Sequence, residues 1–150
     1  PRRTSTIFAV QLWHPSGDEP ASLWEVMGRQ KEIEYSSRAD SHIARQQQIH
    51  RLRHVINELA QHVPELARRR ADVGELCSYG CRTVMHVVRL MAPRLAHDDQ
   101  TKDIDFTAEA IAARWKAGLA DARAALAAAP WREPIEPLQG VTLHDFSAAG

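Results

Sequence analysis

Two apolar stretches decide the fold of this chain: Ile7-Phe8-Ala9-Val10-Gln11-Leu12-Trp13 and Thr83-Val84-Met85-His86-Val87-Val88-Arg89-Leu90-Met91. Both are apolar at odd and even positions alike, and the side chains of a strand alternate between its two faces. Such runs are typical of strands that are buried on both sides, as in a parallel sheet covered by helices. We therefore predict an α/β fold with two buried strands, at about 6–13 and 82–92.

Two strands are too few for a stable sheet, because an isolated pair is marginal in water. Most of the remaining sequence has helical patterning, apart from a short third strand that we expect near 141–146. The sequence thus predicts a predominantly helical α/β fragment whose strands belong to a larger sheet. In that sheet we expect the two apolar segments to lie side by side or one strand apart.

Composition excludes several classes of function. The chain has 150 residues, enough for one domain or part of one, and 19 basic residues balance 19 acidic ones. A formal charge of zero gives no long-range attraction to nucleic acid, so we expect no nucleic-acid partner. No apolar segment is long enough to span a membrane and no signal-peptide pattern is visible, which favours a cytoplasmic or membrane-peripheral location. The two cysteines, Cys77 and Cys81, lack a zinc-site pattern and are expected to be free, buried thiols.

A long helical region follows the first strand. Ser22 and Glu25 form a capping box after the turn-rich segment 14–20, and no proline follows until Pro64. An apolar stripe runs along this region at Leu23, Val26, Met27, Ile33, Ile49, Leu52, Ile56, Leu59 and Val63. The more polar middle, 35–48, is compatible either with a break between two helices or with one long helix.

Two further helices complete the pattern. Pro64 ends the long region, and a shorter helix is expected from Glu65 to about Tyr79 with Gly80 as its C-terminal cap. After a polar loop, Thr107 caps an alanine-rich helix whose apolar stripe we expect to be buried: Ile111, Trp115, Leu119, Ala122 and Leu126. Residues 1–150 are thus predicted to form one region: strand and turn (1–20), helices (21–80), strand (81–93), helix (107–129) and irregular tail (130–150).

Motifs for catalysis or cofactor binding are missing. The seven glycines are too dispersed for a phosphate-binding loop, and no G-x-S-x-G elbow holds a serine nucleophile. His50 and His54 lie one helical turn apart, a spacing that suits zinc. Arg51 stands where a metalloprotease needs glutamate, so a solvated or interface face is the favoured interpretation. His86 is expected to be a buried histidine with a satisfied hydrogen bond. We expect no catalytic residue, metal or cofactor in this chain.

Three other groups of residues invite a functional interpretation, and each has a simpler one. The acidic cluster Asp98, Asp99, Asp103 and Asp105 lacks the pattern of a calcium loop and is typical of a polar loop with an aspartate cap. Arg68-Arg69-Arg70 is most simply a solvated face. The four tryptophans, Trp13, Trp24, Trp115 and Trp131, are expected in the core or at seams rather than as ligand platforms.

Three stretches, taken together, resemble one family. They are Leu23-Trp24-Glu25-Val26-Met27-Gly28-Arg29-Gln30-Lys31-Glu32-Ile33-Glu34-Tyr35-Ser36-Ser37-Arg38, then Gly80-Cys81-Arg82-Thr83-Val84-Met85-His86-Val87-Val88-Arg89-Leu90, then Thr101-Lys102-Asp103-Ile104-Asp105-Phe106 with Arg114-Trp115-Lys116-Ala117-Gly118-Leu119-Ala120-Asp121-Ala122-Arg123. In order and spacing they resemble the C-terminal region of bacterial patatin-like phospholipases, a domain of unknown function. The likeness spans about Ile7 to Phe146.

The resemblance implies a place in a lipid acyl hydrolase with an α/β core and a Ser–Asp dyad. The family carries its serine in G-x-S-x-G, its aspartate in D-G-G or D-G-A, and a glycine-rich oxyanion loop. None of these motifs occurs here, so no catalytic residue can be assigned and the chain alone is predicted to be inactive. The resemblance places this chain downstream of the catalytic aspartate, with the N-terminal catalytic core as its partner and a lipid or ester as the substrate of the whole.

Two functions remain as alternatives. In the first, the chain is the non-catalytic C-terminal part of a patatin-like hydrolase, where it completes the core sheet and shapes the lipid-facing surface. In the second, the helical region 22–62 is a protein–protein interaction module that joins a homo-oligomer or another protein. The polar middle of that region favours the second slightly, because a helix without a continuous apolar face often bridges rather than packs.

Overall fold

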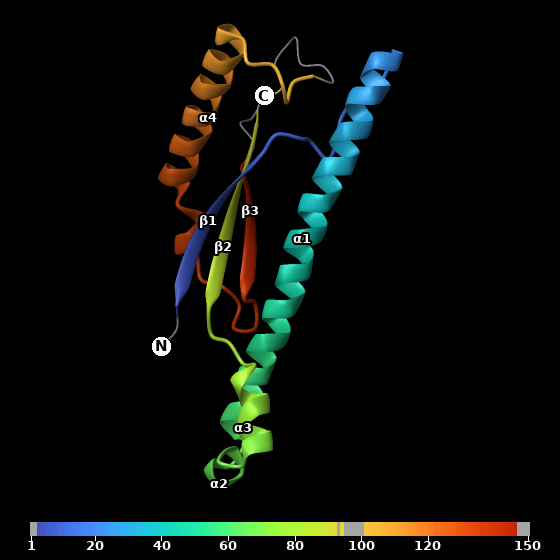
Figure 1. Ribbon diagram of the computed structural model, residues 1–150. Coiled ribbons are helices and arrows are strands. Elements are labelled where there is room, and N and C mark those ends of the chain that lie inside the picture. Colours follow the sequence, from blue (N-terminus) through green and yellow to red (C-terminus); the bar gives the residue numbers. More distant parts are fainter. Residues whose placement is uncertain (1–2, 93, 95–100, 147–150) are drawn as a thin grey trace. The chain divides into compact units, whose positions relative to one another are not determined.

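The computed structural model describes residues 3–92, 94 and 101–146. Its elements follow the chain in the order β1 (Thr4–Gln11), α1 (Leu23–His62), α2 (Glu65–Arg68), α3 (Ala71–Ser78), β2 (Val84–Met91), α4 (Ala108–Ala128), a 3₁₀ turn (Pro130–Arg132) and β3 (Val141–Phe146) (Figure 1). Helices and a small sheet thus make an α/β fold, as predicted.

The three strands form one parallel sheet in the order β1-β2-β3. The amide of Val84 donates to the carbonyl of Arg3, and that of Ala92 to the carbonyl of Gln11, each at 2.8 Å. The residue offset is the same at both ends, as a parallel pair requires. On the other side of β2, the amide of Met85 donates to the carbonyl of Gly140 at 2.9 Å. The two apolar segments are therefore neighbours, and the third strand is confirmed.

Strands β1 and β2 differ in burial. The central strand β2 is the core of the sheet, with Val84, Val87, Val88 and Leu90 all buried. On the edge strand β1, Ile7 and Phe8 are each 45% exposed and Val10 is 78% exposed. The strand itself is confirmed, whereas burial of its two faces is not met within this chain. Its burial in a larger sheet stays a prediction.

Helix α1 is one continuous helix of 40 residues, so of the two alternatives for 35–48 the single long helix is the one that occurs. Its start has the expected capping box: the Ser22 hydroxyl accepts from the Glu25 amide at 3.3 Å, and the Glu25 carboxylate accepts from the Ala21 amide at 2.7 Å. In the polar middle, the hydroxyl of the buried Ser36 donates to the carbonyl of Glu32 one turn earlier. These contacts keep polar side chains compatible with the helix.

The single helix expected from Glu65 to about Tyr79 is wrong, because the segment forms two helices, α2 and α3. Arg70, which precedes α3, has an extended backbone (φ −69°, ψ 137°) that interrupts the helical hydrogen-bond pattern. Its guanidinium then pairs with Asp72 in the first turn of α3 at 2.8 Å, which stabilises the new start.

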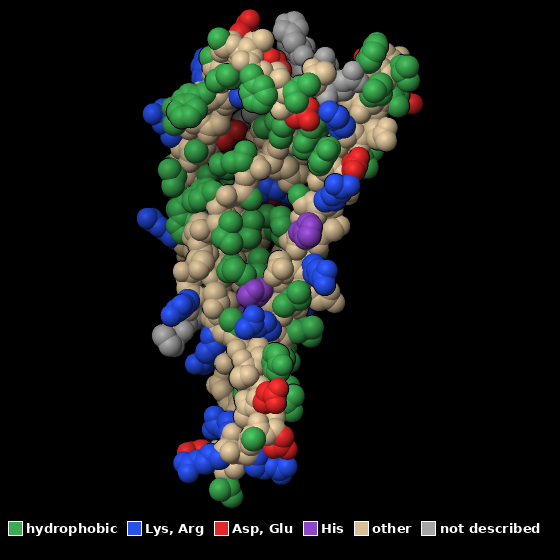
Figure 2. Space-filling view, in the orientation of Figure 1, with side chains coloured by type: hydrophobic (Ala, Val, Ile, Leu, Met, Phe, Trp, Pro, Cys, Tyr) green, Lys and Arg blue, Asp and Glu red, His purple; other side chains and the backbone are tan. Residues whose placement is uncertain are grey.

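Helix α4 has the predicted cap, since the Thr107 hydroxyl accepts from the Ala110 amide at 3.3 Å. The expected burial of its large apolar stripe is wrong: Trp115 is 74% exposed, and Ile111, Leu119 and Leu126 are exposed as well. The buried residues of α4 are Ala110, Asp121 and Ala125. Small side chains let a helix approach its neighbours closely, so α4 turns its alanine face inward and its large residues outward. Figure 2 shows hydrophobic side chains at the surface over α4.

The residues gather into two compact units, through which β1, α1, β2 and β3 each pass. Unit 1 consists of His42–Val87, Trp131–Leu143 and the start of β1 as far as Ile7. Unit 2 consists of Phe8–Ser41, Val88–Pro130 and the end of β3 from His144. Unit 1 thus contains α2 and α3, and unit 2 contains α4.

Candidate functional site

The strands bring polar residues together where they end, within unit 2. Gln11 is the last residue of β1, Arg89 lies near the end of β2 and Asp145 near the end of β3. The carboxyl ends of parallel strands meet at one edge of the sheet, and in open α/β folds this edge is where ligands bind. The cluster at this edge is therefore a candidate site.

Arg89 is the centre of this cluster. Its side chain is 11% exposed and donates to both carboxylate oxygens of Asp145, at 2.6 and 2.9 Å. It also donates to the Asp40 carboxylate from α1 and, at 3.4 Å, to the Gln11 side chain. The hydrogen bonds that Arg89 donates to the carboxylates of Asp145 and Asp40 raise its pKa against the opposing effect of burial. One side chain thus joins three strands and α1, and all its contacts are made within the protein.

A second cluster surrounds Trp13, just after β1 in the same unit. The Trp13 ring stacks on Tyr35 with ring centroids 5.3 Å apart. The ammonium groups of Lys102 and Lys31 lie 4.6 and 5.7 Å from the centroid of Trp13. Lys102 is buried and pairs with Glu32 at 3.0 Å, which holds the segment before α4 against the first half of α1. Trp13 is thus a half-buried packing residue, as expected.

The carboxyl of Glu32 has a lowered pKa in this cluster. Burial is the largest influence and would raise the pKa, but the hydrogen bond and charge of Lys102, with help from Arg29, outweigh it. Arg29 also donates to the carbonyls of His14 and Pro15, at 3.3 and 2.8 Å. These cations hold the turn after β1 and have carboxylate or carbonyl partners. The arrangement is that of a structural cluster.

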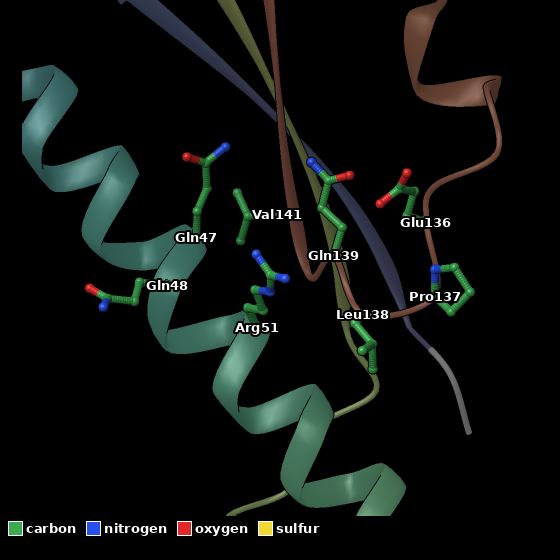
Figure 3. Close-up of a pocket in the computed structure, with 8 residues that line it drawn as sticks. All are labelled: Gln47, Gln48, Arg51, Glu136, Pro137, Leu138, Gln139 and Val141. Atoms are coloured by element: carbon green, nitrogen blue, oxygen red, sulfur yellow. The ribbon is translucent and has the colours of Figure 1, made fainter.

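Unit 1 carries a groove beside α1, drawn in Figure 3. It has a volume of about 640 Å³ and is lined by Gln47, Gln48 and Arg51 on one side and by 136–139 and Val141 on the other. A smaller hollow of about 390 Å³ adjoins it through Pro137 and Leu138. No sequence motif pointed to this groove, because its walls come from segments far apart in the chain.

The histidines singled out from the sequence lie beside this groove. Of the solvated or interface face expected for them, the solvated alternative does not hold, because neither side chain is exposed. His54 is buried, and its ring nitrogen Nε2 lies 2.9 Å from the carbonyl of Thr83. His50 is half-buried, and burial lowers its pKa, with a smaller effect from Arg53. Both pack against Gly140, where an added Cβ would lie 2.8 Å from the Cβ of His50. Among residues 3–92, 94 and 101–146, no group of three or more metal-ligating side chains occurs.

The other residues singled out have mixed outcomes. His86 is buried as predicted, and Cys77 and Cys81 are free but only half-buried. Asp105 caps the approach to α4 by accepting from the Thr107 amide at 3.1 Å, and Asp103 pairs with Lys31. Asp98 and Asp99 lie outside the described residues.

The arginine run and two of the tryptophans are on the surface. Arg68, Arg69 and Arg70 are exposed, as predicted, and Figure 2 shows Lys and Arg side chains around α2 and α3. Trp24 is 64% exposed and Trp115 is 74% exposed. Among the described residues, these two tryptophans therefore do not lie in a core or at a seam, as was expected of them.

The cluster around Arg89 was not predicted from the sequence. One signal was available: Arg89 is a charged residue inside an otherwise apolar strand, and a buried charge needs a partner. Asp145 in the third strand was a candidate by the same reasoning. Asp40 carried no signal, since it lies in the polar middle of α1.

Comparison with protein families identifies the chain. A family model described as patatin phospholipase, for a domain of unknown function, matches residues 33–138, which is most of the sequence. The chain therefore belongs to the patatin phospholipase family. No curated protein and no solved structure matches it.

A helix that crosses a membrane must be both long and apolar. Within the part of the chain that the structure describes, none combines the length and the apolar character that a span would need.

Proposed function

We propose that this chain is the non-catalytic C-terminal part of a patatin-like lipid acyl hydrolase, in which it completes the core sheet and shapes the lipid-facing surface. Family membership supports the class of hydrolase, and the absence of the serine and aspartate motifs supports a non-catalytic role. The observation that carries the proposal is the free edge of β1.

The edge of β1 is ready to accept another parallel strand. Arg3 and Gln11 direct their carbonyls toward β2, so the alternation of a strand directs the backbone groups of Thr4, Thr6 and Val10 away from it. Among the described residues no strand pairs with these groups. Parallel sheets are normally covered on both faces, and an open apolar edge is a template for pairing.

The side chains around this edge favour the same partner. Ile7, Phe8 and Val10 are exposed on both faces of β1, and the large residues of α4 are exposed in unit 2. A monomeric soluble protein rarely exposes so many large apolar side chains. A catalytic α/β core would supply both the missing strand and the helices that cover it.

The proposal is tested by binding. The chain is mixed with the catalytic domain of a patatin phospholipase that carries G-x-S-x-G and D-G-G but lacks its own copy of this region, and complex formation is followed by sedimentation velocity. Thr6→Pro removes an outward amide without touching the β1-β2 hydrogen bonds, and Val10→Lys places a charge on the exposed strand. Leu66→Lys, at an equally exposed leucine in α2, is the control.

We expect a one-to-one complex for the unchanged chain and for Leu66→Lys, and at least tenfold weaker association for the two β1 variants. A folded chain that does not bind, or β1 variants that bind like the control, would contradict the proposal.

A second function is favoured by the surface of α1. In unit 1, Leu52 and Leu59 are 58% and 61% exposed and lie two turns apart on the same face. A helix with such residues can join a second copy or another protein. If Leu59→Lys, but not Val10→Lys, abolishes self-association of the purified chain, the interaction module gains over the sheet-completing role.

A further inference from the structure

An exposed cation without an ion-pair partner among the described residues, Arg51, lines the groove in unit 1. Arg51 projects from α1 into the space between Val141, Gln139 and Leu138, as Figure 3 shows. Within the described part of the chain, no carboxylate lies within ion-pair distance of its guanidinium. A guanidinium stays charged at every physiological pH and presents donors in a planar fork that fits a carboxylate.

Two amides stand beside this guanidinium. Gln47 and Gln139 line the same groove from opposite sides, both are half-buried, and neither side chain has a hydrogen-bond partner among the described residues. Each amide offers two N–H donors. Arg51, Gln47 and Gln139 therefore form a donor set with one positive charge.

The remaining walls limit the ligand. Glu136 lines the same groove, so the charged side chains of the lining sum to zero and the groove gives a multiply charged anion no advantage over a singly charged one. Pro137, Leu138 and Val141 supply apolar surface next to the donors, and the adjoining hollow extends past Pro137 and Leu138 to Ile135. A site with a few polar groups against apolar walls suits an amphiphile.

We propose that this groove binds a fatty acid, with its carboxylate on Arg51 and its first carbons along Leu138 and Pro137. The donor set and walls indicate an apolar monocarboxylate. The choice of a fatty acid within that class rests on the proposed function, because a lipid acyl hydrolase releases this product.

The test is isothermal titration calorimetry of the 150-residue chain with decanoate below its micelle concentration. Decanol, which has the same chain without the charge, and decyl phosphate, which carries a larger charge, are the comparison ligands. Arg51→Gln removes the cation of the groove, and Arg45→Gln removes another exposed arginine of the same helix that does not line the groove. Leu138→Gln makes the apolar wall polar. Circular dichroism establishes that each variant keeps its helix content.

We expect decanoate to bind at least tenfold more tightly than decanol or decyl phosphate, and Arg51→Gln to remove this preference while Arg45→Gln keeps it. Leu138→Gln should weaken decanoate and decanol alike. Absence of decanoate binding, equal binding of decanol, or an Arg51→Gln variant that binds like the unchanged chain would overturn the inference. The measurement needs no catalytic domain, so it is independent of the binding test of the proposed function.

Discussion

Replacement of Arg89 by methionine tests how far one buried side chain holds unit 2 together. The change keeps most of the aliphatic volume and removes the guanidinium, which makes two hydrogen bonds to Asp145 and one each to Asp40 and Gln11. Removing one member of a buried ion pair typically lowers the free energy of unfolding by about 3 to 5 kcal/mol when the remaining charge stays buried and unpaired. Here Asp40 and Asp145 are 45% and 55% exposed, so water can solvate them after the change.

We therefore expect Arg89→Met to lower the free energy of unfolding by about 2 kcal/mol, the order of one or two charge-assisted hydrogen bonds. In a chain of this size the melting temperature should fall by roughly 4 to 8 °C. Urea unfolding followed by circular dichroism measures the change. Arg69→Met is the matched control, because Arg69 and Glu65 are each 73% exposed and such pairs contribute less than about 1 kcal/mol. Equal stability of the two variants would refute the central role of Arg89.

Four further outcomes follow from the structure. Glu32→Gln should remove an acid-dependent loss of stability, because the pKa of Glu32 is lowered on folding. The contribution of Glu32 to stability is full above its ordinary pKa of 4.5 and is lost as the pH falls from there through the folded pKa, so the urea midpoints of the two chains are compared at pH 3.5 and pH 6. Gly140→Ala should destabilise by roughly 1 to 3 kcal/mol through the clash with His50, whereas Gly118→Ala, with open space around it in α4, should stabilise by about 0.5 to 1 kcal/mol. Trp115→Ala should change the unfolding free energy of the isolated chain by less than about 1 kcal/mol, and a cost above 3 kcal/mol would restore the buried stripe. The purified chain should not hydrolyse a nitrophenyl ester, and turnover abolished by a fluorophosphonate would contradict this.

The pattern of β2 was enough to predict its place in the fold. Val84, Val88 and Leu90 are buried on one face of β2 and Val87 on the other, and only the centre of a covered sheet accepts such a strand. Helix boundaries were also predictable wherever a cap was visible, as at Ser22 and Thr107. These signals are local, so they do not depend on the rest of the protein.

The polar sites were not predictable in the same way. The groove around Arg51 has one wall from α1 and another from 136–141, and the sequence of neither segment predicts that the two lie together. The partners of Arg89 lie at positions 11, 40 and 145, brought together by the parallel crossovers of the sheet. A charged Arg89 within an apolar strand indicates that a partner is needed, but only the fold determines which carboxylates lie near it. His54 shows the same limit, since its partner is a backbone carbonyl at Thr83.

The misassigned stripe of α4 bears on the function. Ile111, Trp115, Leu119 and Leu126 recur at helical spacing, and such a pattern indicates a covered face without specifying what covers it. Within this chain α4 packs through Ala110 and Ala125 instead. The large stripe and the outward side of β1 are thus two apolar surfaces that the described residues leave exposed. A second copy that paired only along the edge of β1 would cover that strand and leave the stripe of α4 exposed. An α/β core would add both strands and helices. The exposed stripe therefore favours the catalytic core over a second copy as the partner of this region.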